Sequence, residues 1–306
     1  MDGAKLPHSQ RPSRMRRLLS SEAFTAYSFL AVPLLYFAAI RFYPIAYNIY
    51  LSFTDYQLID APQWVGLENY SWITGNEPVR RAILNTVLFT IGSVPLGTAL
   101  GLTVAVLLNY PFVKGRVMFR TLFYLPVITS VIVASLVWLL IYNPQSGLLN
   151  GVLNAVGLPS QTWLRDPNLA MPSVIAVMIW SAIGAHMIIF LAGLQEIPEE
   201  ILDASKLDGA NGFQTFFHVI IPMLRPVILF VVVTASIGVF RSFGEIFVLT
   251  QGGPQLRTTT LVWEVYQNGF GYLHLGRSAA IAIVLLLIIL LITFINFRIL
   301  EERGAH

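Results

Sequence analysis

The 306-residue sequence contains no cysteine, so disulfide bonds, thiol catalysis and thiolate metal sites are excluded. It has little charge, because Asp, Glu, Lys and Arg form 11% of its residues, against about 25% in a typical soluble domain. No G-x-x-x-x-G-K-[S/T] phosphate loop occurs, so we predict that the chain itself does not hydrolyse ATP. The five histidines are scattered without metal-ligand spacing, and we expect no metal. The net charge of +3 gives no reason to expect nucleic acid as a partner.

The sequence contains several long apolar runs. Hydrophobic residues make up 56% of it and the mean hydropathy is +0.68, which indicates a membrane protein. A bilayer core of about 30 Å takes about 20 helical residues to cross. Runs of that length lie at 24–53, 82–109, 118–142, 172–195, 226–250 and 278–300. None alternates with the period of two that barrel strands require, so we predict an all-α membrane protein with six transmembrane helices.

Lys and Arg indicate the orientation of these spans, since they are retained on the cytoplasmic side near span ends. They gather in the amino-terminal tail and in the loop that contains Lys114 and Arg116. An even number of spans places both termini on the same side. We therefore expect a basic cytoplasmic tail over 1–23, a six-span domain over 24–300 and a cytoplasmic tail over 301–306. The first run is too long for the apolar core of a signal peptide, so no cleavage is expected.

The segment 196–225 lies between two apolar runs but is charged. Five of its residues are acidic: Glu196, Glu199, Glu200, Asp203 and Asp208. Pro198 suits the first turn of a helix and Gly209 suits a sharp turn, after which a second helical run begins near Phe213. Pro222 and Pro226 are expected to end that run. We predict two short helices at an angle, exposed to the cytoplasm, although the charge pattern alone also fits a solvated connection between spans.

The same segment resembles the EAA motif, the cytoplasmic coupling segment of ABC importer permeases. We therefore call residues 196–225 the coupling segment. The matching residues are Asp203, Ala204, Ser205, Asp208, Gly209, Ala210, Phe213, Pro222 and Pro226. The sequence departs from the usual motif in having Asp203 where Glu is common and Ser205 where Ala is common.

A second resemblance narrows the family. The sequence VFRSFGEIFVLTQGGPQLRTTTL, residues 239–261, is similar to the end of the penultimate span in carbohydrate-importer permeases of the maltose and glycerol-3-phosphate uptake type. This resemblance implies a type I ABC importer permease in the cytoplasmic membrane of a prokaryote. It also implies a second, homologous permease chain as heterodimer partner, two copies of a cytoplasmic ATPase subunit that hold ATP and Mg, and an external solute-binding protein or lipoprotein. Membrane lipid surrounds the spans.

In such importers the coupling segment inserts into a groove of the ATPase subunit. The resemblance implies that Asp203 makes a charge-assisted contact there. It also implies that Phe213, Phe216 and Phe217 supply the packing that makes the connection stiff. Ordinary packing of a helical hairpin is the alternative for each phenylalanine.

The substrate path is expected on the fourth and fifth spans. The resemblance maps sugar contacts onto Met178, Ser181, Ala182, Ala185, Gly238, Val239 and Ser242. From the residues themselves, the polar side chains within apolar runs are alternative lining groups, because such residues mark transport pathways. These are Asn85, Trp180, His186, Arg241 and Glu245. Arg241 and Glu245 are four residues apart, so on a continuous helix we expect them to pair.

Three other functions fit parts of the sequence. The chain could be an ABC permease for a non-sugar solute. A secondary transporter driven by an ion gradient would use Arg241, Glu245 and His186 as a proton relay, but no inverted repeat is evident. A membrane-embedded enzyme would need a nucleophile or metal constellation, and the sequence suggests none. We predict a non-catalytic permease subunit that binds no cofactor of its own.

Overall fold

The computed structural model describes residues 22–110 and 113–301, so the amino-terminal tail and the last residues of the carboxyl-terminal tail lie outside the described residues. The chain divides into two compact units at Leu51 and Ser52, and each is considered separately. In the first unit, α2 (Glu22–Phe37), the π-helix η1 (Ala38–Phe42) and α3 (Tyr43–Ser52) follow one another. Together they give an apolar helix, Ala26–Ser52, long enough to cross a membrane, with a mean hydropathy of 1.7.

The second unit is helical apart from one short hairpin. Its elements, in order, are β1 (Thr54–Asp55), β2 (Gln63–Trp64), α4 (Glu68–Gly75), α5 (Glu77–Asn109), α6 (Arg116–Ile128), α7 (Val131–Ile141), α8 (Leu148–Ala155), η2 (Trp163–Arg165), α9 (Ala170–Gln195), α10 (Glu199–Leu207), α11 (Gly212–Thr215), η3 (Phe216–Ile220), α12 (Ile221–Met223), α13 (Arg225–Phe240), α14 (Gly244–Leu249), α15 (Leu261–Tyr266), η4 (Gln267–Gly271) and α16 (Leu275–Glu301). The two strands pair antiparallel, with Thr54 opposite Trp64.

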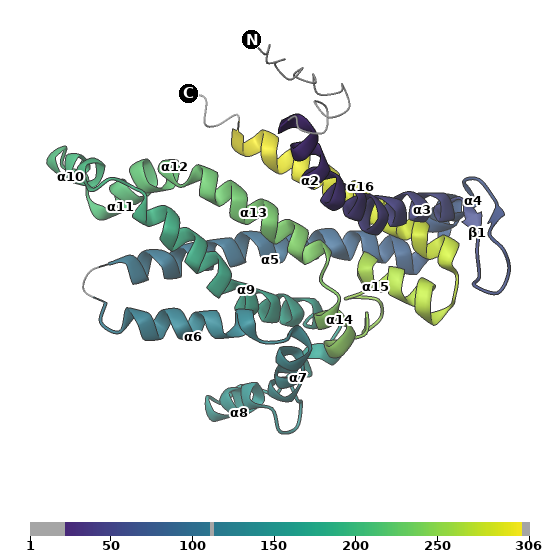
Figure 1. Ribbon diagram of the computed structural model, residues 1–306. Helices are drawn as coiled ribbons and strands as arrows, with labels where there is room; N and C mark the ends of the chain where they lie inside the picture. Colours follow the sequence, from purple (N-terminus) through teal and green to yellow (C-terminus); the bar gives the residue numbers. More distant parts are fainter. Residues whose placement is uncertain (1–21, 111–112, 302–306) are drawn as a thin grey trace, which may run out of the picture. The chain divides into compact units, whose positions relative to one another are not determined.

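Helices α5 and α9 form the centre of this unit and lie side by side (Figure 1). Small residues recur every four positions on one face of α5, at Ser93, Gly97, Gly101 and Ala105. This small-xxx-small spacing lets two membrane helices approach closely. At Gly101 a Cβ atom would collide with the Cβ of His186 on α9, so the close approach requires glycine there.

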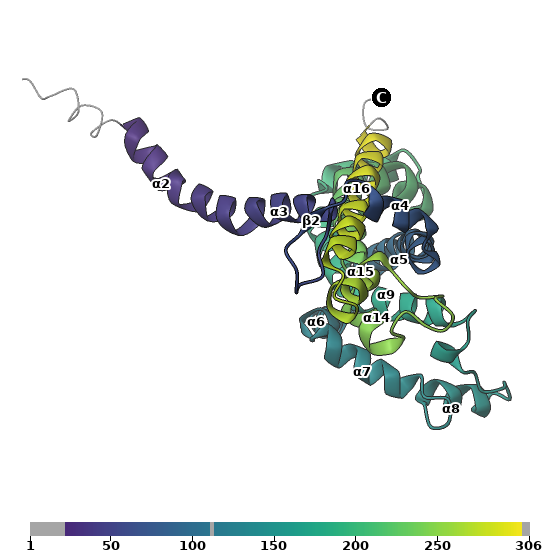
Figure 2. The same ribbon diagram turned by 90° about the vertical axis from the view of Figure 1, so that its right-hand side faces the viewer.

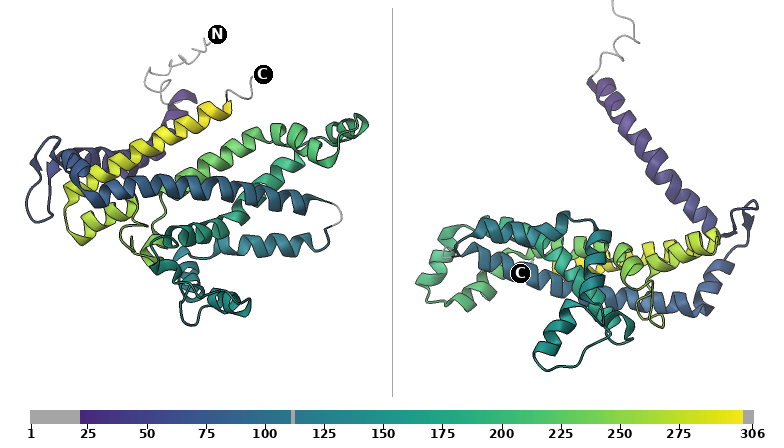
Figure 3. Two further views of the ribbon diagram at one scale, coloured as in Figure 1. Left: turned by 180° about the vertical axis from the view of Figure 1, so that it is seen from behind. Right: turned by 90° about the horizontal axis from the view of Figure 1, so that it is seen from below.

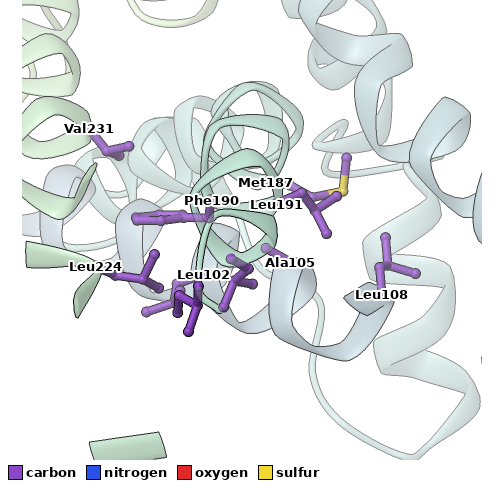
Figure 4. Packing of buried hydrophobic residues seen from close by; sticks show 10 residues of the cluster. Leu102, Ala105, Leu108, Met187, Phe190, Leu191, Leu224 and Val231 are labelled. Atoms are coloured by element: carbon purple, nitrogen blue, oxygen red, sulfur yellow. The ribbon is translucent and has the colours of Figure 1, made fainter. Parts of the chain in front are cut away.

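The main apolar core lies between these two helices and the start of α13 (Figure 4). Leu102, Ala105 and Leu108 of α5 face Met187 and Phe190 of α9. The spacing of three within each set places its members on one helical face. Phe190 and Met187 are fully buried, so they hold the two helices together at this end.

The described residues contain up to six candidate spans if each bent helix pair counts as one. Four described helices are long and apolar enough to cross a membrane, at Ala26–Ser52, Glu77–Asn109, Ala170–Gln195 and Leu275–Arg298. Two further helix pairs pass the same test only together, with bends of 103° between α6 and α7 and 68° between Gly212–Met223 and α13. The prediction of an all-α membrane protein is confirmed, but two of the expected spans are not continuous helices.

The third expected span, 118–142, is broken near its middle. Helix α6 ends at Ile128, Thr129 and Ser130 are extended, and α7 leaves at an angle of 103°. Pro126 lies in the last turn of α6 and has no amide hydrogen. It therefore cannot donate the helical hydrogen bond to the carbonyl four residues earlier, which weakens the helix at that point. Helix α7 then packs beside α14 and leads to α8 (Figure 2).

The fifth expected span, 226–250, is also interrupted. Helix α13 ends at Phe240, and α14 begins only at Gly244. Ser242 lies in this interruption and Glu245 lies in the first turn of α14, three residues later. The Ser242 hydroxyl donates a hydrogen bond to Glu245 Oε2 at 3.1 Å.

Candidate functional site

The coupling segment stands at the end of α9 that is remote from α14 (Figures 1 and 3). Its first helix, α10, follows Pro198 and is closed by a glycine turn. Gly209 has a φ of +80°, its amide donates to the Lys206 carbonyl at 3.1 Å, and the Ala210 amide donates to the Ser205 carbonyl at 3.0 Å. This pair of bonds is a Schellman motif. The predicted helix and glycine turn are therefore confirmed.

A second helical run begins directly after the turn. Asn211 accepts from the Gln214 amide at 2.9 Å, and the Gln214 side chain accepts from the Asn211 amide at 2.9 Å, which is a capping box. The run continues through η3 to Met223. It ends between Pro222 and Pro226, as expected, and Pro226 lies in the first turn of α13, where its missing amide hydrogen costs little.

Ser205 joins the two short helices. Its side chain is buried, and its hydroxyl donates to the Leu202 carbonyl at 2.8 Å. The same hydroxyl lies 3.3 Å from the Thr215 hydroxyl on α11. A small polar residue at this position therefore contacts both helices and stabilises the angle between them.

The outer face of the coupling segment is apolar and exposed. Leu207 is 89% exposed and Phe213 is 72% exposed. Phe217 is also exposed, and its ring centre lies 4.5 Å from that of Phe213. Phe216 instead packs against the core cluster of α5 and α9. The three phenylalanines thus connect an exposed aromatic surface to the buried ends of two spans.

In the isolated chain, the carboxylate of Asp203 is paired with a residue of the same helix. Asp203 Oδ1 accepts from Lys206 Nζ at 2.8 Å, and both side chains are exposed. This pairing raises the pKa of Lys206. An exposed pair of this kind exchanges readily for another partner, because it contributes little to stability.

A second candidate site is a half-open cavity of about 330 Å³ between α5, α9, α13 and the start of α14. It brings together every residue that the resemblance mapped onto the substrate path, together with two of the polar residues chosen from the sequence. Its lining includes Met178, Ser181, Ala182, Ala185, His186, Gly238, Val239, Ser242 and Glu245. Because α13 ends just before Ser242, the interruption of the fifth span turns Glu245 into this cavity.

The expected pair of Arg241 and Glu245 does not form. Arg241 terminates α13 and is exposed, whereas Glu245 is buried in α14 and accepts from Ser242. The two residues are not on one continuous helix, so the spacing of four does not bring them together. Arg241 is not among the described residues that line the cavity.

Asn85 and Trp180 also lie elsewhere. The Asn85 side-chain amide donates to the carbonyls of Leu256 and Thr259, at 2.7 and 3.0 Å. It thereby fastens the threonine-rich loop after α14 onto α5. The Trp180 ring lies edge-to-face with Trp138 of α7, with ring centres 5.5 Å apart.

Comparison with known proteins identifies the family. The family described as "Binding-protein-dependent transport system inner membrane component" matches residues 93–303, which contain the coupling segment and all of the described cavity lining. The chain belongs to this family. It is an ABC transporter permease, as the resemblance of its coupling segment implied.

The permease is similar in sequence to known transport proteins and similar in fold to a solved structure. It is 36% identical to the arabinooligosaccharides transport system permease protein AraP of Halalkalibacterium halodurans, over 94% of this chain and 90% of that protein. It is 35% identical to the sn-glycerol-3-phosphate transport system permease protein UgpA of Agrobacterium fabrum, over 79% of this chain and 83% of that protein. A chain of a bacterial alginate ABC transporter, solved in complex with an alginate pentasaccharide-bound periplasmic protein, superposes with a TM-score of 0.82 at 21% identity, covering 96% of this permease and 99% of that chain.

Proposed function

We propose that this permease moves a sugar, an oligosaccharide or a glycerol-phosphate-type solute across the cytoplasmic membrane by alternating access. The names of the two relatives support this substrate class. The observation that carries the proposal is the combination of an exposed aromatic coupling segment with a solute-sized cavity on the same helices. Helix α9 connects the two, since it ends at the coupling segment and lines the cavity.

In this mechanism a cytoplasmic ATPase subunit binds the coupling segment and supplies the energy. Phe213 and Phe217 enter a groove on the ATPase, and Asp203 exchanges Lys206 for a basic residue of that subunit. Because Phe216 is packed into the core, movement of the ATPase is transmitted to α5 and α9 as a rigid-body motion. The permease contributes no catalytic group, and both of its termini lie in the cytoplasm.

The complete importer contains a second permease chain, two ATPase copies and an external solute-binding protein or lipoprotein. The family description, which names binding-protein-dependent transport, supports the external partner. ATP and Mg are bound by the ATPase subunits.

Two similarly exposed phenylalanines provide a matched test. Phe213 is 72% exposed in the coupling segment, and Phe270 is 73% exposed in η4 at the other end of the unit. Phe213→Ser should reduce co-purification of the ATPase about tenfold or more, because a buried phenylalanine contributes about 2 kcal/mol to an interface. Phe270→Ser should leave co-purification unchanged. Equal retention of the ATPase by both variants would contradict the proposed docking surface.

A further inference from the structure

The cavity contains one acidic side chain and no Lys or Arg among the described residues that line it. Glu245 is 8% exposed, and no ion pair to it occurs in the described part of the chain. Its Oε2 accepts from Ser242, and its Oε1 has no hydrogen-bond partner among the described residues. A buried carboxylate needs partners, so Oε1 is available to a donor inside the cavity.

The hydroxyl groups of the lining already donate within the chain, so each would have to give up a hydrogen bond before it could donate to a solute. Ser181 donates to the Met178 carbonyl at 2.9 Å and Thr234 to the Phe230 carbonyl at 2.7 Å. Ser93 donates to a carbonyl of its own helix, and Ser242 donates to Glu245. Each oxygen keeps a free lone pair, so in this arrangement these groups present acceptors to a solute.

His186 adds a second polar group to the lining. It is 8% exposed, lines the cavity, and its Nδ1 atom forms no hydrogen bond in the described structure. A neutral imidazole provides one donor and one acceptor. Acceptors therefore outnumber donors in the cavity, and the charged group among them is negative.

We propose that this cavity selects neutral, polyhydroxylated solutes over solutes that carry phosphate or carboxylate, and that Glu245 is the residue that sets this preference. The inference rests on the proposed function and specifies its substrate. Hydroxyl groups of a sugar can donate to Glu245 Oε1 and to the lining oxygens. A phosphate or carboxylate group can only accept, and it would meet a carboxylate in a site of low polarity.

The absence of native cysteine allows the charge of the cavity to be measured without a known solute. Ala185→Cys, in the lining, would be labelled in the assembled importer with positively and negatively charged methanethiosulfonates of similar size. The cationic reagent should react roughly five- to tenfold faster, and Glu245→Gln should bring the ratio close to one. Ser160→Cys, on an exposed loop, serves as the control, and its ratio should not respond to Glu245→Gln.

Two results of the labelling would overturn the inference. One is faster reaction of the anionic reagent at Ala185→Cys, and the other is a ratio that Glu245→Gln leaves unchanged. Ser181→Cys, one helical turn earlier in the same lining, repeats the measurement if Ala185→Cys does not assemble.

Uptake into proteoliposomes separates this inference from the proposed function. Neutral oligosaccharides, arabinotriose among them, would be compared with glycerol 3-phosphate and oligogalacturonate. Uptake of neutral solutes is expected, with Glu245→Gln raising the relative uptake of anionic ones several-fold. Uptake of anionic solutes alone would overturn the inference and leave the proposed function intact. Uptake of neither class would overturn the proposed substrate class, while the labelling ratio would still decide the charge preference.

Discussion

Substitution of Gly209 tests the geometry of the coupling segment most directly. Gly209 has a φ of +80°, and a Cβ atom at this position would have no neighbour within 4 Å. Any effect of Gly209→Ala therefore comes from backbone conformation and not from a steric clash. A left-handed conformation costs an L-residue about 1–2 kcal/mol, which corresponds to roughly a five- to thirtyfold loss of the turn population.

A graded series follows from this reasoning. Asn tolerates the left-handed region better than Ala, so Gly209→Asn should lose less ATPase affinity than Gly209→Ala. Gly209→Pro should lose most, because proline fixes φ near −65° and removes the amide that donates to the Lys206 carbonyl. Gly212 is the matched control, since a Cβ there also has no neighbour within 4 Å and Gly212 begins α11 in ordinary helical conformation. Gly212→Ala should bind normally.

The assay is the affinity of the ATPase subunit for the permease in nanodiscs, together with solute moved per ATP hydrolysed in proteoliposomes. We expect affinity to fall in the order glycine, asparagine, alanine, proline. Wild-type affinity and coupling in the proline variant would refute the role of the turn. An equal loss in Gly209→Ala and Gly212→Ala would refute the conformational explanation.

Three further substitutions test the packing of the second unit. Gly101→Leu should prevent stable assembly, measured by gel filtration in detergent, because even its Cβ would collide with His186. Asn85→Leu should destabilise the chain by about 2–4 kcal/mol, seen as a lower melting temperature, because it leaves two carbonyls of the loop 251–260 without their donor. Burial raises the pKa of Glu264 above its usual 4.5, so the protonated acid favours the folded state. The melting temperature should therefore fall as pH rises from 4.5 through that raised pKa, and Glu264→Gln should flatten this part of the profile.

The coupling segment could be predicted in detail because its signals are local. Pro198 before α10, Gly209 in the turn and the acidic first turn of α10 each act within a few residues. The capping box of Asn211 and Gln214 is equally local, although it was not recognised from the sequence. The end of the second run, between Pro222 and Pro226, follows from an equally local signal.

The membrane character and the helical class follow from the sequence alone, because a run of about 20 apolar residues has few alternatives to a membrane helix. The position at which such a run bends is harder to predict from the sequence. Spans 118–142 and 226–250 are apolar over most of their length, so apart from Pro126 their patterns carry little signal for the breaks at Thr129 and Arg241.

The tertiary structure decided which polar residues meet. On a straight helix Arg241 and Glu245 would be close enough to pair, but the break after Phe240 exposes Arg241 and places Glu245 in the lining of the cavity. Asn85 looked like a pathway residue and instead holds a loop 171 and 174 residues away in the chain. A sequence shows that a polar group is present in a span, whereas its role depends on which distant backbone groups the fold brings within hydrogen-bonding distance.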